Sequence, residues 1–556
     1  MFRKHQEQFA AICHNIRTGQ TPHLRSLICS ITPGGGKSML PVIAAGELIG
    51  AVADRICWVV PRRSLQQQAE GEFLKPQFRQ LLGHSHAIRR STNEFDPCRG
   101  LAGFATTYQA IGMSNAHLVD EFRHRRYILI LDEPHHIEEG GAWEAALAPL
   151  VQRAVLTVYM SGTLERGNRK RIAFLPYTGS YEGEIVDLYG GEGSSAISYS
   201  RRDALLDRAI LPIHFELMDG TAEWIGRDGE TYSTQLSEAA KDTAEALYTA
   251  LKTQFADQLL DDTTAHWAAH RKTYPRSKML VVTANIEDAK KYVAHLRHAG
   301  IKAAIATSDD SAQAAANIEH FRSVGLKKSL DALVTVAMAY EGLDVPSITH
   351  IACLTHIRSR PWIEQMIARA TRFDEPAGPW EEQMAYVYVP DDRNMCAIIQ
   401  HMQDDQITAL KQMKEAEEGL DPLPSATERR QPEERNSIVP VGSQGLRRRS
   451  NRVGQLSLYG EPQAPPRPPE RTPSQQEAEM RDKIQKYCKQ VDLLRFEKKW
   501  GETNRRVVTY FQKPRTQMTL EELNRVMAWL EQNYPLAASQ GARRGQPALS
   551  GASRRS

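Results

Sequence analysis

The sequence predicts an α/β protein with two parallel-sheet domains in tandem, followed by a disordered linker and a small helical domain. Uninterrupted apolar runs at 127–131 and 279–284 are typical of strands buried inside a parallel sheet. From about residue 420, prolines, arginines, serines and glutamines dominate, and such a segment cannot bury enough apolar surface to fold. Beyond residue 476, apolar residues recur at helical spacing.

A glycine-rich segment follows the first predicted strand. Residues 30–38 read S-I-T-P-G-G-G-K-S and come directly after the apolar stretch 27–29. In such a loop, successive backbone N–H groups point at phosphate oxygens, Lys37 would reach the β- and γ-phosphates, and the Ser38 hydroxyl would bind Mg²⁺. The glycines assigned to this phosphate cradle are Gly34, Gly35 and Gly36. A plain glycine-rich turn is the alternative, because Ile31 occupies the first glycine position of G-x-x-x-x-G-K-[ST].

An acidic motif follows the apolar run 127–131, which leads into D-E-P-H-H. Ligands of open α/β sheets bind outside the carboxyl ends of the strands, so Asp132 and Glu133 should lie beside the Lys37 loop. Asp132 would hold Mg²⁺, Glu133 would orient or deprotonate the attacking water, and His135 completes the predicted catalytic set. An acidic turn after a strand is the alternative interpretation.

The order and spacing of these motifs resemble superfamily 2 helicases and translocases of the D-E-x-H class, and more narrowly the motor subunits of type I and III restriction enzymes. The resemblance covers about residues 1–400 and implies two RecA-like lobes that use ATP and Mg²⁺. Residues 2–6 (F-R-K-H-Q) resemble the R-x-x-Q element of that branch, in which the glutamine reads the adenine edge. Gln6 is therefore implied as an adenine ligand, with a solvated helix face as the alternative.

Several further segments resemble family elements that lie along the nucleic-acid backbone. Residues 56–63 resemble motif Ia, 106–109 resemble motif Ib, and Ser161-Gly162-Thr163 stands where the family has S-A-T. Hydroxyl, amide and arginine donors suit sequence-independent phosphate contacts. The implied nucleic-acid contacts are Pro61, Arg62, Thr106, Thr107, Thr283 and Thr335. For Pro61 and Arg62 an ordinary strand exit is equally compatible with the sequence.

The second half supplies the remaining family elements. Residues 338–346 resemble the E-G-x-D segment, which implies that Gly342 and Asp344 approach the ribose and phosphates of ATP. Residues 365–372 resemble Q-x-x-G-R-x-x-R, with Gln365 as an ATP contact and alanine at 368 instead of glycine. Arg369 and Arg372 are three residues apart, so on a helix both would enter the ATP cleft and neutralise charge on the γ-phosphate. A surface helix with solvated arginines is the alternative.

The predicted organisation has six parts: 1–165 lobe one, 166–262 connector, 263–418 lobe two, 419–475 disordered linker, 476–536 helical domain and 537–556 disordered tail. Net charge is only +3, so a nucleic-acid site would be a local groove. Seven scattered cysteines without C-x-x-C favour a reducing compartment, and no apolar run has membrane-spanning length. We expect a cytoplasmic, nucleoid-associated bacterial protein with no membrane partner.

The linker contains an isolated apolar peptide, Gln455-Leu456-Ser457-Leu458-Tyr459. It resembles the Q-L-[SD]-L-F peptide by which bacterial replication and repair proteins bind the DNA sliding clamp, with Tyr459 in place of phenylalanine. A tethered peptide of this kind would raise the local concentration of the protein on DNA. A chance match of five residues is the alternative, so the clamp is a candidate partner.

In the helical domain, T-L-E-E at 519–522 predicts a helix-capping box, and Trp500 and Trp529 are expected in its core. The resemblance as a whole implies an ATP-dependent DNA helicase or translocase acting in replication, recombination or repair. Two other functions stay open: an RNA helicase, and an ATP-gated motor or scaffold subunit of a nuclease complex. The sequence has no P-D-x-D/E-x-K-like nuclease cluster, so cleavage would require a nuclease partner.

Overall fold

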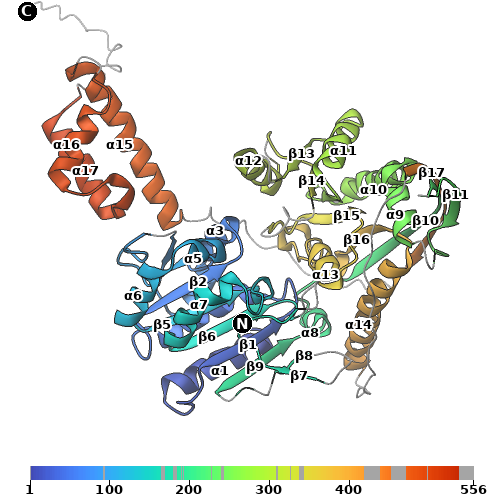
Figure 1. The fold of residues 1–556 in the computed structure, drawn as a ribbon, viewed down its shortest axis with the longest axis horizontal. Helices are drawn as coiled ribbons and strands as arrows, with labels where there is room; N and C mark the ends of the chain where they lie inside the picture. The colour runs from blue at the N-terminus through green and yellow to red at the C-terminus, as the bar shows by residue number, and fades with distance from the viewer. Residues whose placement is uncertain are drawn as a thin grey trace, which may run out of the picture.

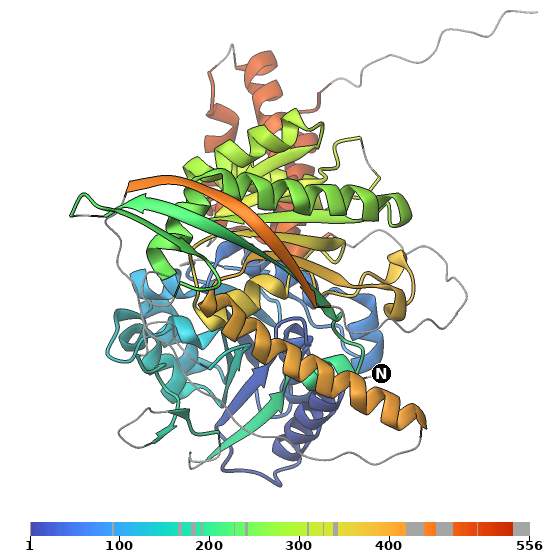
Figure 2. The same ribbon diagram turned by 90° about the vertical axis from the view of Figure 1, so that its right-hand side faces the viewer.

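The computed structural model of the chain confirms the predicted fold class, with two sheets that form two lobes and a separate group of helices (Figures 1 and 2). It describes residues 2–91, 94–164, 170–179, 185–188, 191, 193–226, 228–239, 243–307, 311–325, 327–336, 343–418, 439–451, 471–496 and 499–536. No helix in these ranges is long and apolar enough to span a membrane.

Lobe one is built on a parallel sheet of seven strands in the order β3-β4-β2-β5-β6-β1-β9. The strands are β1 (Ser26–Ile31), β2 (Arg55–Val60), β3 (Ile88–Arg90), β4 (Gly103–Thr107), β5 (Tyr127–Asp132), β6 (Leu156–Ser161) and β9 (Ser194–Tyr199). Every residue of β5 is buried, as the apolar run predicts. The carboxyl ends of β1 and β5 therefore meet at one edge, separated by β6.

Helices cover both faces of this sheet (Figure 1). One face packs against α1 (Lys4–Arg17), α2 (Leu40–Leu48) and α3 (Arg63–Glu72). The other face packs against α5 (Tyr108–Met113), α6 (Ala116–His124) and α7 (Ala142–Arg153). Because successive strand residues point to opposite faces, Ile128 and Ile130 of β5 enter the first core and Leu129 and Leu131 the second.

Lobe two has a sheet in the order β11-β10-β16-β15-β12-β14-β13, with β17 paired to β10. Its strands are β10 (Ile213–Ile225), β11 (Thr231–Gln235), β12 (Lys278–Thr283), β13 (Ala303–Ala306), β14 (Ala332–Val336), β15 (Ile348–Leu354), β16 (Ala385–Pro390) and β17 (Val439–Asn451). One face packs against α9 (Thr243–Lys252), α10 (Gln254–Thr273) and α11 (Ile286–His298). The other packs against α12 (Ser311–Arg322), α13 (Arg360–Ile367) and α14 (Arg393–Glu418).

The segment expected to be a connector is divided between the two sheets. Strand β9 pairs with β1 of lobe one, and β10 pairs with β16 of lobe two. Between them lies α8 (Arg201–Leu206), whose N-cap Ser200 accepts a hydrogen bond from the Asp203 N–H group. The predicted connector therefore supplies strands to both sheets, and only a short stretch of chain runs between the two lobes.

Part of the predicted linker is also paired. The backbone of β17 runs antiparallel to β10 from Phe215 to Ile225, with register shifts at Asp219/Gly220 and Glu223/Trp224 (Figure 2). Strand β10 is long, and both β16 and β11 pair with the same edge of it. The other edge pairs with β17, since Thr221 pairs with Gln235 of β11 on one side and with Gln444 of β17 on the other. Pairing with β17 satisfies the backbone groups of the second edge. The expectation that 419–475 lacks structure therefore does not hold for 439–451.

The third domain consists of α15 (Pro473–Arg495), α16 (Glu502–Phe511) and α17 (Leu520–Asn533), packed around a small apolar core. The predicted capping box is present: the Thr519 hydroxyl accepts from the Glu522 N–H group, and the Glu522 carboxylate accepts from the Thr519 N–H group. Trp529 packs against the core as expected. The prediction for Trp500 is wrong, because the α15–α16 turn leaves its ring 62% exposed.

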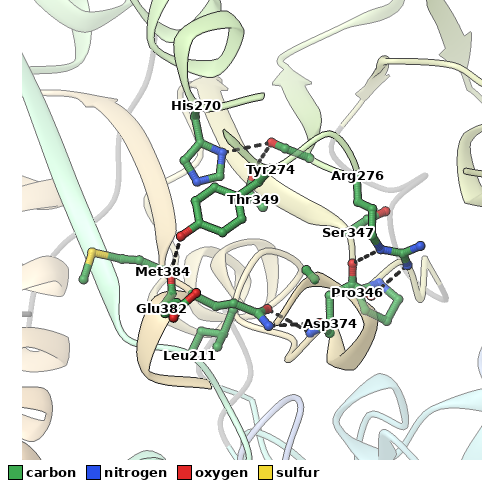
Figure 3. A pocket seen from close by; sticks show the side chains of 13 residues that line it. Leu211, His270, Tyr274, Arg276, Pro346, Ser347, Thr349, Asp374, Glu382 and Met384 are labelled. Atoms are coloured by element: carbon green, nitrogen blue, oxygen red, sulfur yellow. Dashed lines mark hydrogen bonds and ion pairs between the residues drawn. The ribbon is translucent and has the colours of Figure 1, made fainter. Parts of the chain in front are cut away.

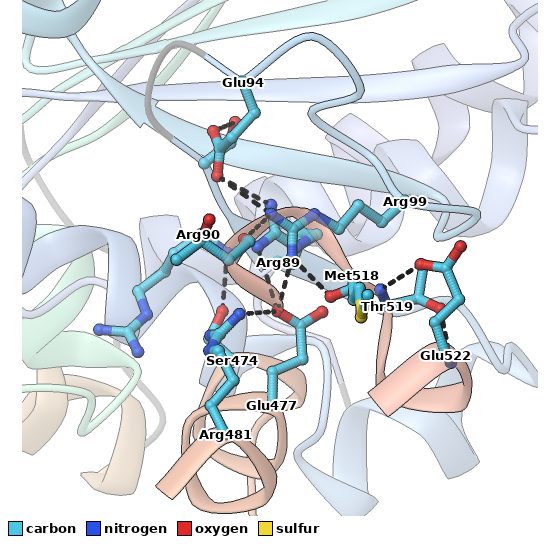
Figure 4. Close-up of polar contacts among 12 residues, drawn as sticks. Arg89, Arg90, Glu94, Arg99, Ser474, Glu477, Arg481, Met518, Thr519 and Glu522 are labelled. Atoms are coloured by element: carbon cyan, nitrogen blue, oxygen red, sulfur yellow. Dashed lines mark hydrogen bonds and ion pairs between the residues drawn. The ribbon is translucent and has the colours of Figure 1, made fainter. Parts of the chain in front are cut away.

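A buried charged cluster joins this domain to lobe one (Figure 4). We call it the docking cluster: Arg89, Arg99 and Glu477, whose side chains are only 4–5% exposed. The Glu477 carboxylate lies 3.0 Å from Nη1 of Arg99 and 3.4 Å from Nη2 of Arg89. At the start of α15, the Ser474 N–H group donates to Glu70 of α3 (2.8 Å). The helical domain is thus fixed to lobe one by contacts between residues 378 to 404 positions apart in the chain.

Lobe two contains a buried cluster of histidines. His350 of β15 is completely buried, and its Nε2 atom lies 2.9 Å from Nδ1 of His266 on α10. The rings of His266 and His270 each lie 5.1 Å from that of His350, with Tyr274, Tyr386 and Tyr388 around them. Burial, and then the neighbouring histidines, hold the pKa of His350 well below its usual value and lower the pKa of His270 to about 4.

These shifts predict that lobe two loses stability in mild acid. A histidine whose pKa is lower in the folded than in the unfolded chain stabilises the fold above about pH 6.5, and this contribution disappears as the pH falls toward 4. We expect the free energy of unfolding of lobe two to fall by on the order of 1–2 kcal/mol between pH 7 and pH 5. Urea unfolding at several pH values measures this slope.

The matched variants are His270→Gln and His298→Gln, the second at an exposed position at the end of α11. Replacement of His270 should flatten the slope, whereas replacement of His298 should leave it unchanged. Equal slopes in the wild type and His270→Gln would contradict the assignment to this cluster.

Candidate functional site

The glycine-rich loop connects β1 to the short 3₁₀ helix η1 (Lys37–Met39). Gly34 and Gly36 have φ angles of +85° and +90°, which favour glycine. A Cβ atom on Gly35 would lie 2.8 Å from the Thr32 carbonyl oxygen. The three glycines are therefore required by the loop geometry, and the loop has the form of a backbone cradle for an anion.

Helix α1 holds this loop from the side. The Arg3 guanidinium donates to the Gly35 carbonyl (2.6 Å), and the Gln6 amide donates to the Gly36 carbonyl (3.2 Å). Gln6 also accepts from the Arg3 N–H group at 3.0 Å. Gln6 is 5% exposed, and its side chain contacts the loop and the Arg3 backbone. Its role as an adenine ligand stays a prediction.

Lys37 is held by both acidic residues of the second motif. Its ammonium forms an ion pair with the Glu133 carboxylate and lies 3.2 Å from Oδ1 of Asp132. Trp58 Nε1 donates to Oδ2 of Asp132 (3.3 Å), and the Tyr108 hydroxyl donates to its carbonyl (2.8 Å). Burial lowers the pKa of Lys37, and Asp132 opposes this effect. The predicted lysine and carboxylates thus form one partly buried charged centre.

This centre fits a magnesium-bound triphosphate. Oδ1 of Asp132 is buried and lies 3.2 Å from the Lys37 ammonium, so it could act as a hard oxygen ligand once Lys37 turns to a phosphate. Ser38 follows Lys37 in η1 and could supply the hydroxyl ligand that the motif predicts. Elsewhere in the described ranges, no cluster of three or more histidine, cysteine or acidic side chains is suited to a metal.

Ser161 connects the acidic motif to the S-G-T segment at the end of β6. Its hydroxyl donates to the Glu133 carboxylate (2.9 Å) and lies 3.1 Å from Nδ1 of His135. The same oxygen accepts from the Thr163 N–H group at 3.1 Å. Glu133 itself has a φ angle of 52°, in the left-handed region, which turns its side chain toward Lys37. A movement of the Glu133 carboxylate would therefore be transmitted to Thr163 through the Ser161 side chain alone.

The glycine of the S-G-T segment has a steric explanation. A Cβ atom on Gly162 would lie 2.8 and 2.9 Å from the Cγ and Cδ atoms of Pro33 in the glycine-rich loop. Contacts this short require one side to move. Pro33 and Gly162 are thus a complementary pair, which accounts for glycine where the resembled family has alanine.

We predict that Gly162→Ala lowers nucleic-acid-stimulated ATP hydrolysis by roughly 10-fold or more, because small displacements of reacting groups have large effects on rate. Pro33→Ala removes the obstructing ring atoms, so the double variant should recover part of the loss. Steady-state ATPase rates of the four proteins give the coupling. If the two substitutions are additive, the proposed contact does not limit the reaction.

The two predicted arginines lie opposite this centre on lobe two. Both lower the pKa of Lys37 by their positive charge, which places them near the glycine-rich loop. Arg372 forms an ion pair with Asp344 (2.8 Å), and this guanidinium holds the pKa of the Asp344 carboxyl below its usual value. Arg369 donates to the Leu343 carbonyl at 3.3 Å. The structure thus places Arg372, paired with Asp344, and Arg369 close enough to Lys37 for their charges to act on its pKa.

The predicted helical spacing of these arginines is wrong. Helix α13 ends at Ile367, and Arg369 lies in the turn that follows. The chain then becomes extended. The Leu211 N–H group donates to the Thr371 carbonyl (2.7 Å), and Ile210 forms an isolated antiparallel β-bridge with Arg372. The turn and this pairing bring both side chains to the cleft without a helix.

The segment after the arginines is fixed by a second ion pair (Figure 3). Nε and Nη2 of Arg276 donate to the Asp374 carboxylate at 2.8 and 2.9 Å. The Gln383 amide donates to the Asp374 carbonyl (2.9 Å) and accepts from its N–H group (3.1 Å). Of the other predicted ATP contacts, Gln365 is buried on α13, and Gly342 lies outside the described residues.

The predicted nucleic-acid contacts lie in different surroundings. Pro61 and Arg62 lie between β2 and α3, on the surface side of the strand exit. Thr106, Thr283 and Thr335 are completely buried in their strands, and Thr107 caps α5 by accepting from the Ala110 N–H group (3.1 Å). The role of all six residues as nucleic-acid contacts stays a prediction.

Residues 455–459, the predicted clamp-binding peptide, lie outside the described residues. Conversely, the structure reveals functional contacts that the sequence reasoning missed, those of Arg3, Trp58, Tyr108 and the docking cluster. For Arg3, its place in R-x-x-Q was an available signal. The others depend on tertiary contacts between residues far apart in the chain.

Comparisons with known families agree with this geometry. Residues 1–166 match the family described as "Type III restriction enzyme, res subunit", and residues 256–374 match "Helicase conserved C-terminal domain". Uncharacterised proteins of Mycobacterium leprae (strain TN) and Mycobacterium tuberculosis (strain CDC 1551 / Oshkosh) are 24% and 25% identical over 398 and 391 residues. The matches cover 68% and 67% of this chain and 61% and 59% of the relatives.

Solved structures with a similar arrangement include the type ISP restriction-modification enzyme LlaBIII bound to DNA, with 14% identity and a TM-score of 0.44 over 70% of this chain and 28% of that chain. The helicase domain of Pyrococcus furiosus Hef has 14% identity and a TM-score of 0.39 over 71% and 97%. The amino-terminal part of the chain is thus similar to a restriction-enzyme subunit, and a segment that matches a helicase C-terminal domain follows it.

Proposed function

We propose that this protein is a DNA-stimulated ATPase that couples ATP hydrolysis to movement along DNA. The observation that carries the proposal is the partly buried centre of Lys37, Asp132 and Glu133, with Arg369 and Arg372 of the other lobe near enough to act on the pKa of Lys37. A lysine, two carboxylates and two arginines at one interlobe cleft are the groups that phosphoryl transfer to water requires.

The side chains suggest the following sequence of events. When the triphosphate enters the cradle, the Lys37 ammonium transfers from Glu133 to the phosphate oxygens. Glu133 is then free to orient or accept a proton from the attacking water. Bound Mg²⁺ would neutralise phosphate charge, with Asp132 and Ser38 as its protein ligands.

Closure of the lobes would bring the two arginines to the developing charge on the γ-phosphate. For this step Arg372 must exchange its ion pair with Asp344 for the phosphate, so the open cleft keeps it oriented. Ser161 joins Glu133 to Thr163 and offers a path by which hydrolysis alters the nucleic-acid side of lobe one. Repeated closure and reopening of the lobes would move a strand held across both of them.

Two observations support DNA as the track. The amino-terminal match is to a restriction-enzyme subunit, a family of enzymes that act on DNA. The linker peptide 455–459 resembles a sliding-clamp ligand, which would place the motor on the bacterial nucleoid in replication, recombination or repair. Titration of a bacterial clamp with the wild type and with Gln455→Ala/Leu458→Ala tests that partner, and equal binding by both proteins would exclude this peptide.

The test of the proposed function is ATP hydrolysis measured without nucleic acid and with single-stranded DNA, duplex DNA or RNA, at one low salt concentration. We expect strong stimulation by DNA. Stronger stimulation by RNA would identify an RNA helicase instead. Equal rates in all conditions, together with recovery of a nuclease in a pull-down, would identify a partner-dependent subunit of a nuclease complex.

A further inference from the structure

The helical domain contains a cleft that the motor functions do not use. It lies between α15, α16 and the turn that precedes α17, and it has a volume of about 330 Å³. This volume is in the range of sites for small organic ligands. Its lining includes Arg481, Gln485, Asn504, Val508, Pro514 and Arg515. Two guanidinium groups, two amides and two apolar side chains therefore converge on one space.

Two buried polar atoms in the lining have no partner in the described part of the chain. Nη1 of Arg515 and Oδ1 of Asn504 are both inaccessible to solvent and make no hydrogen bond there, although Nη2 of Arg515 donates to the Gln485 side chain. Buried polar atoms are almost always satisfied in folded proteins. A positively charged donor and an amide acceptor left open together indicate a ligand with both an anionic oxygen and an N–H group.

The apolar part of the lining defines the rest of the ligand. Val508 and Pro514 are stiff side chains without polar atoms, and they line the same cleft as the amides and guanidinium groups. A flat ring can pack against such surfaces while its edge meets Asn504 and Gln485. A phosphate joined to a heterocyclic base has this combination of charge, flat apolar faces and polar edges, and arginine is well suited to the phosphate.

The cleft is also fixed to lobe one through the docking cluster. Nη2 of Arg99 donates to the carbonyl of Thr516, which lines the cleft, at 2.7 Å. Nη1 of Arg481 lies 3.5 Å from the Glu477 carboxylate (Figure 4). The start of α15 rests on Glu70 of α3, the helix that begins directly after Arg62. The cleft is therefore held at a constant position relative to a predicted nucleic-acid contact of the motor.

We propose that this cleft binds one nucleotide of a single-stranded nucleic acid. The phosphate contacts Arg515 and Arg481, the base packs between Val508 and Pro514, and its polar edge bonds with Asn504 and Gln485. A single strand is the occupant because its unstacked bases can enter a cleft that a duplex could not. The inference rests on the proposed function, since it gives the motor a second contact with the strand that it moves along.

The test compares Arg515→Gln with Arg525→Gln in the full-length protein. Arg525 belongs to the same domain but is paired with Glu521 on the exposed side of α17, so the two variants change the net charge equally. Binding of a labelled oligothymidylate, without nucleotide, is measured by fluorescence anisotropy as a function of salt. We expect Arg515→Gln to weaken binding about 5-fold or more and to reduce the salt slope by about 1, with Arg525→Gln like the wild type.

Gln485→Glu provides a second variant that does not depend on Arg515. It keeps the shape of an exposed side chain and adds a negative charge beside the proposed phosphate, so it should also weaken binding. A strand carrying 5-iododeoxyuridine should form photocrosslinks to the peptide that spans Asn504 to Thr516. If the wild type binds the strand but both variants bind equally well and no crosslink forms there, the cleft assignment fails. If the wild type binds no nucleic acid, the proposed function fails instead.

Discussion

Glu133→Gln is expected to lower DNA-stimulated ATP hydrolysis by about 10²–10⁴-fold, the usual contribution of a general base. The amide keeps the size of the side chain but can neither accept the proton of the attacking water nor pair with Lys37 as a carboxylate does. The rate is measured at saturating ATP and DNA, so that the loss appears in kcat. Binding of DNA should persist, because the residue lies on the nucleotide side of Ser161.

Lys37→Ala should lower the same rate by about 10²–10³-fold, because it removes the cation that would stabilise charge on the β- and γ-phosphates. Glu139→Gln is the matched control for Glu133→Gln. Glu139 lies in the same chain segment as Glu133, its side chain is exposed, and its ion pair with Arg171 is long, at 3.7 Å. The control should retain the wild-type rate. Full turnover in either Lys37→Ala or Glu133→Gln would refute the assignment of this cleft as the ATP site.

Glu477→Ala is expected to release the helical domain from lobe one. The substitution removes the buried Glu477 carboxylate and leaves the two buried arginines of the docking cluster with Glu94 alone, at 3.4 and 3.9 Å, and breaking a buried ion pair costs about 3–5 kcal/mol. That exceeds what the remaining contacts, such as Ser474 with Glu70, can be expected to offset. Undocking should appear as rapid proteolysis between the motor and α15 and as a separate, low thermal transition.

Glu479→Ala is the matched control for this prediction. Glu479 lies two residues away on α15, its side chain is 54% exposed, and it pairs with the exposed Arg471. Such a surface pair contributes little, so proteolysis and melting should match the wild type. If Glu477→Ala also behaves like the wild type, the docking cluster does not hold the domain. Under the further inference, undocking should also weaken strand binding by the motor.

The sequence was sufficient for features that depend on local patterns. The apolar run 127–131 became the fully buried β5, the glycines became the cradle, and T-L-E-E at 519–522 became a capping box, because each signal lies within a few consecutive residues. The charged centre was predictable too, since parallel strands bring the ends of β1 and β5 to one edge.

The remaining features depend on contacts that no local pattern encodes. Arg369 and Arg372 leave the helix because Ile210 and Leu211, far away in the chain, pair with the following residues. The strand β17 forms because β10 has a second free edge. Trp500 is exposed because the α15–α16 turn directs it away from the small core, although a large aromatic side chain was expected to be buried. Tertiary structure decides each of these cases.

The central claim is that hydrolysis drives movement on DNA, and displacement of a triplex-forming oligonucleotide from a duplex tests it most directly. This assay reports translocation whether or not the strands separate. We predict ATP-dependent displacement by the wild type and none by Glu133→Gln. Strong DNA-stimulated hydrolysis by the wild type without displacement of the third strand would contradict the account, because the ATP site would then work without moving the protein.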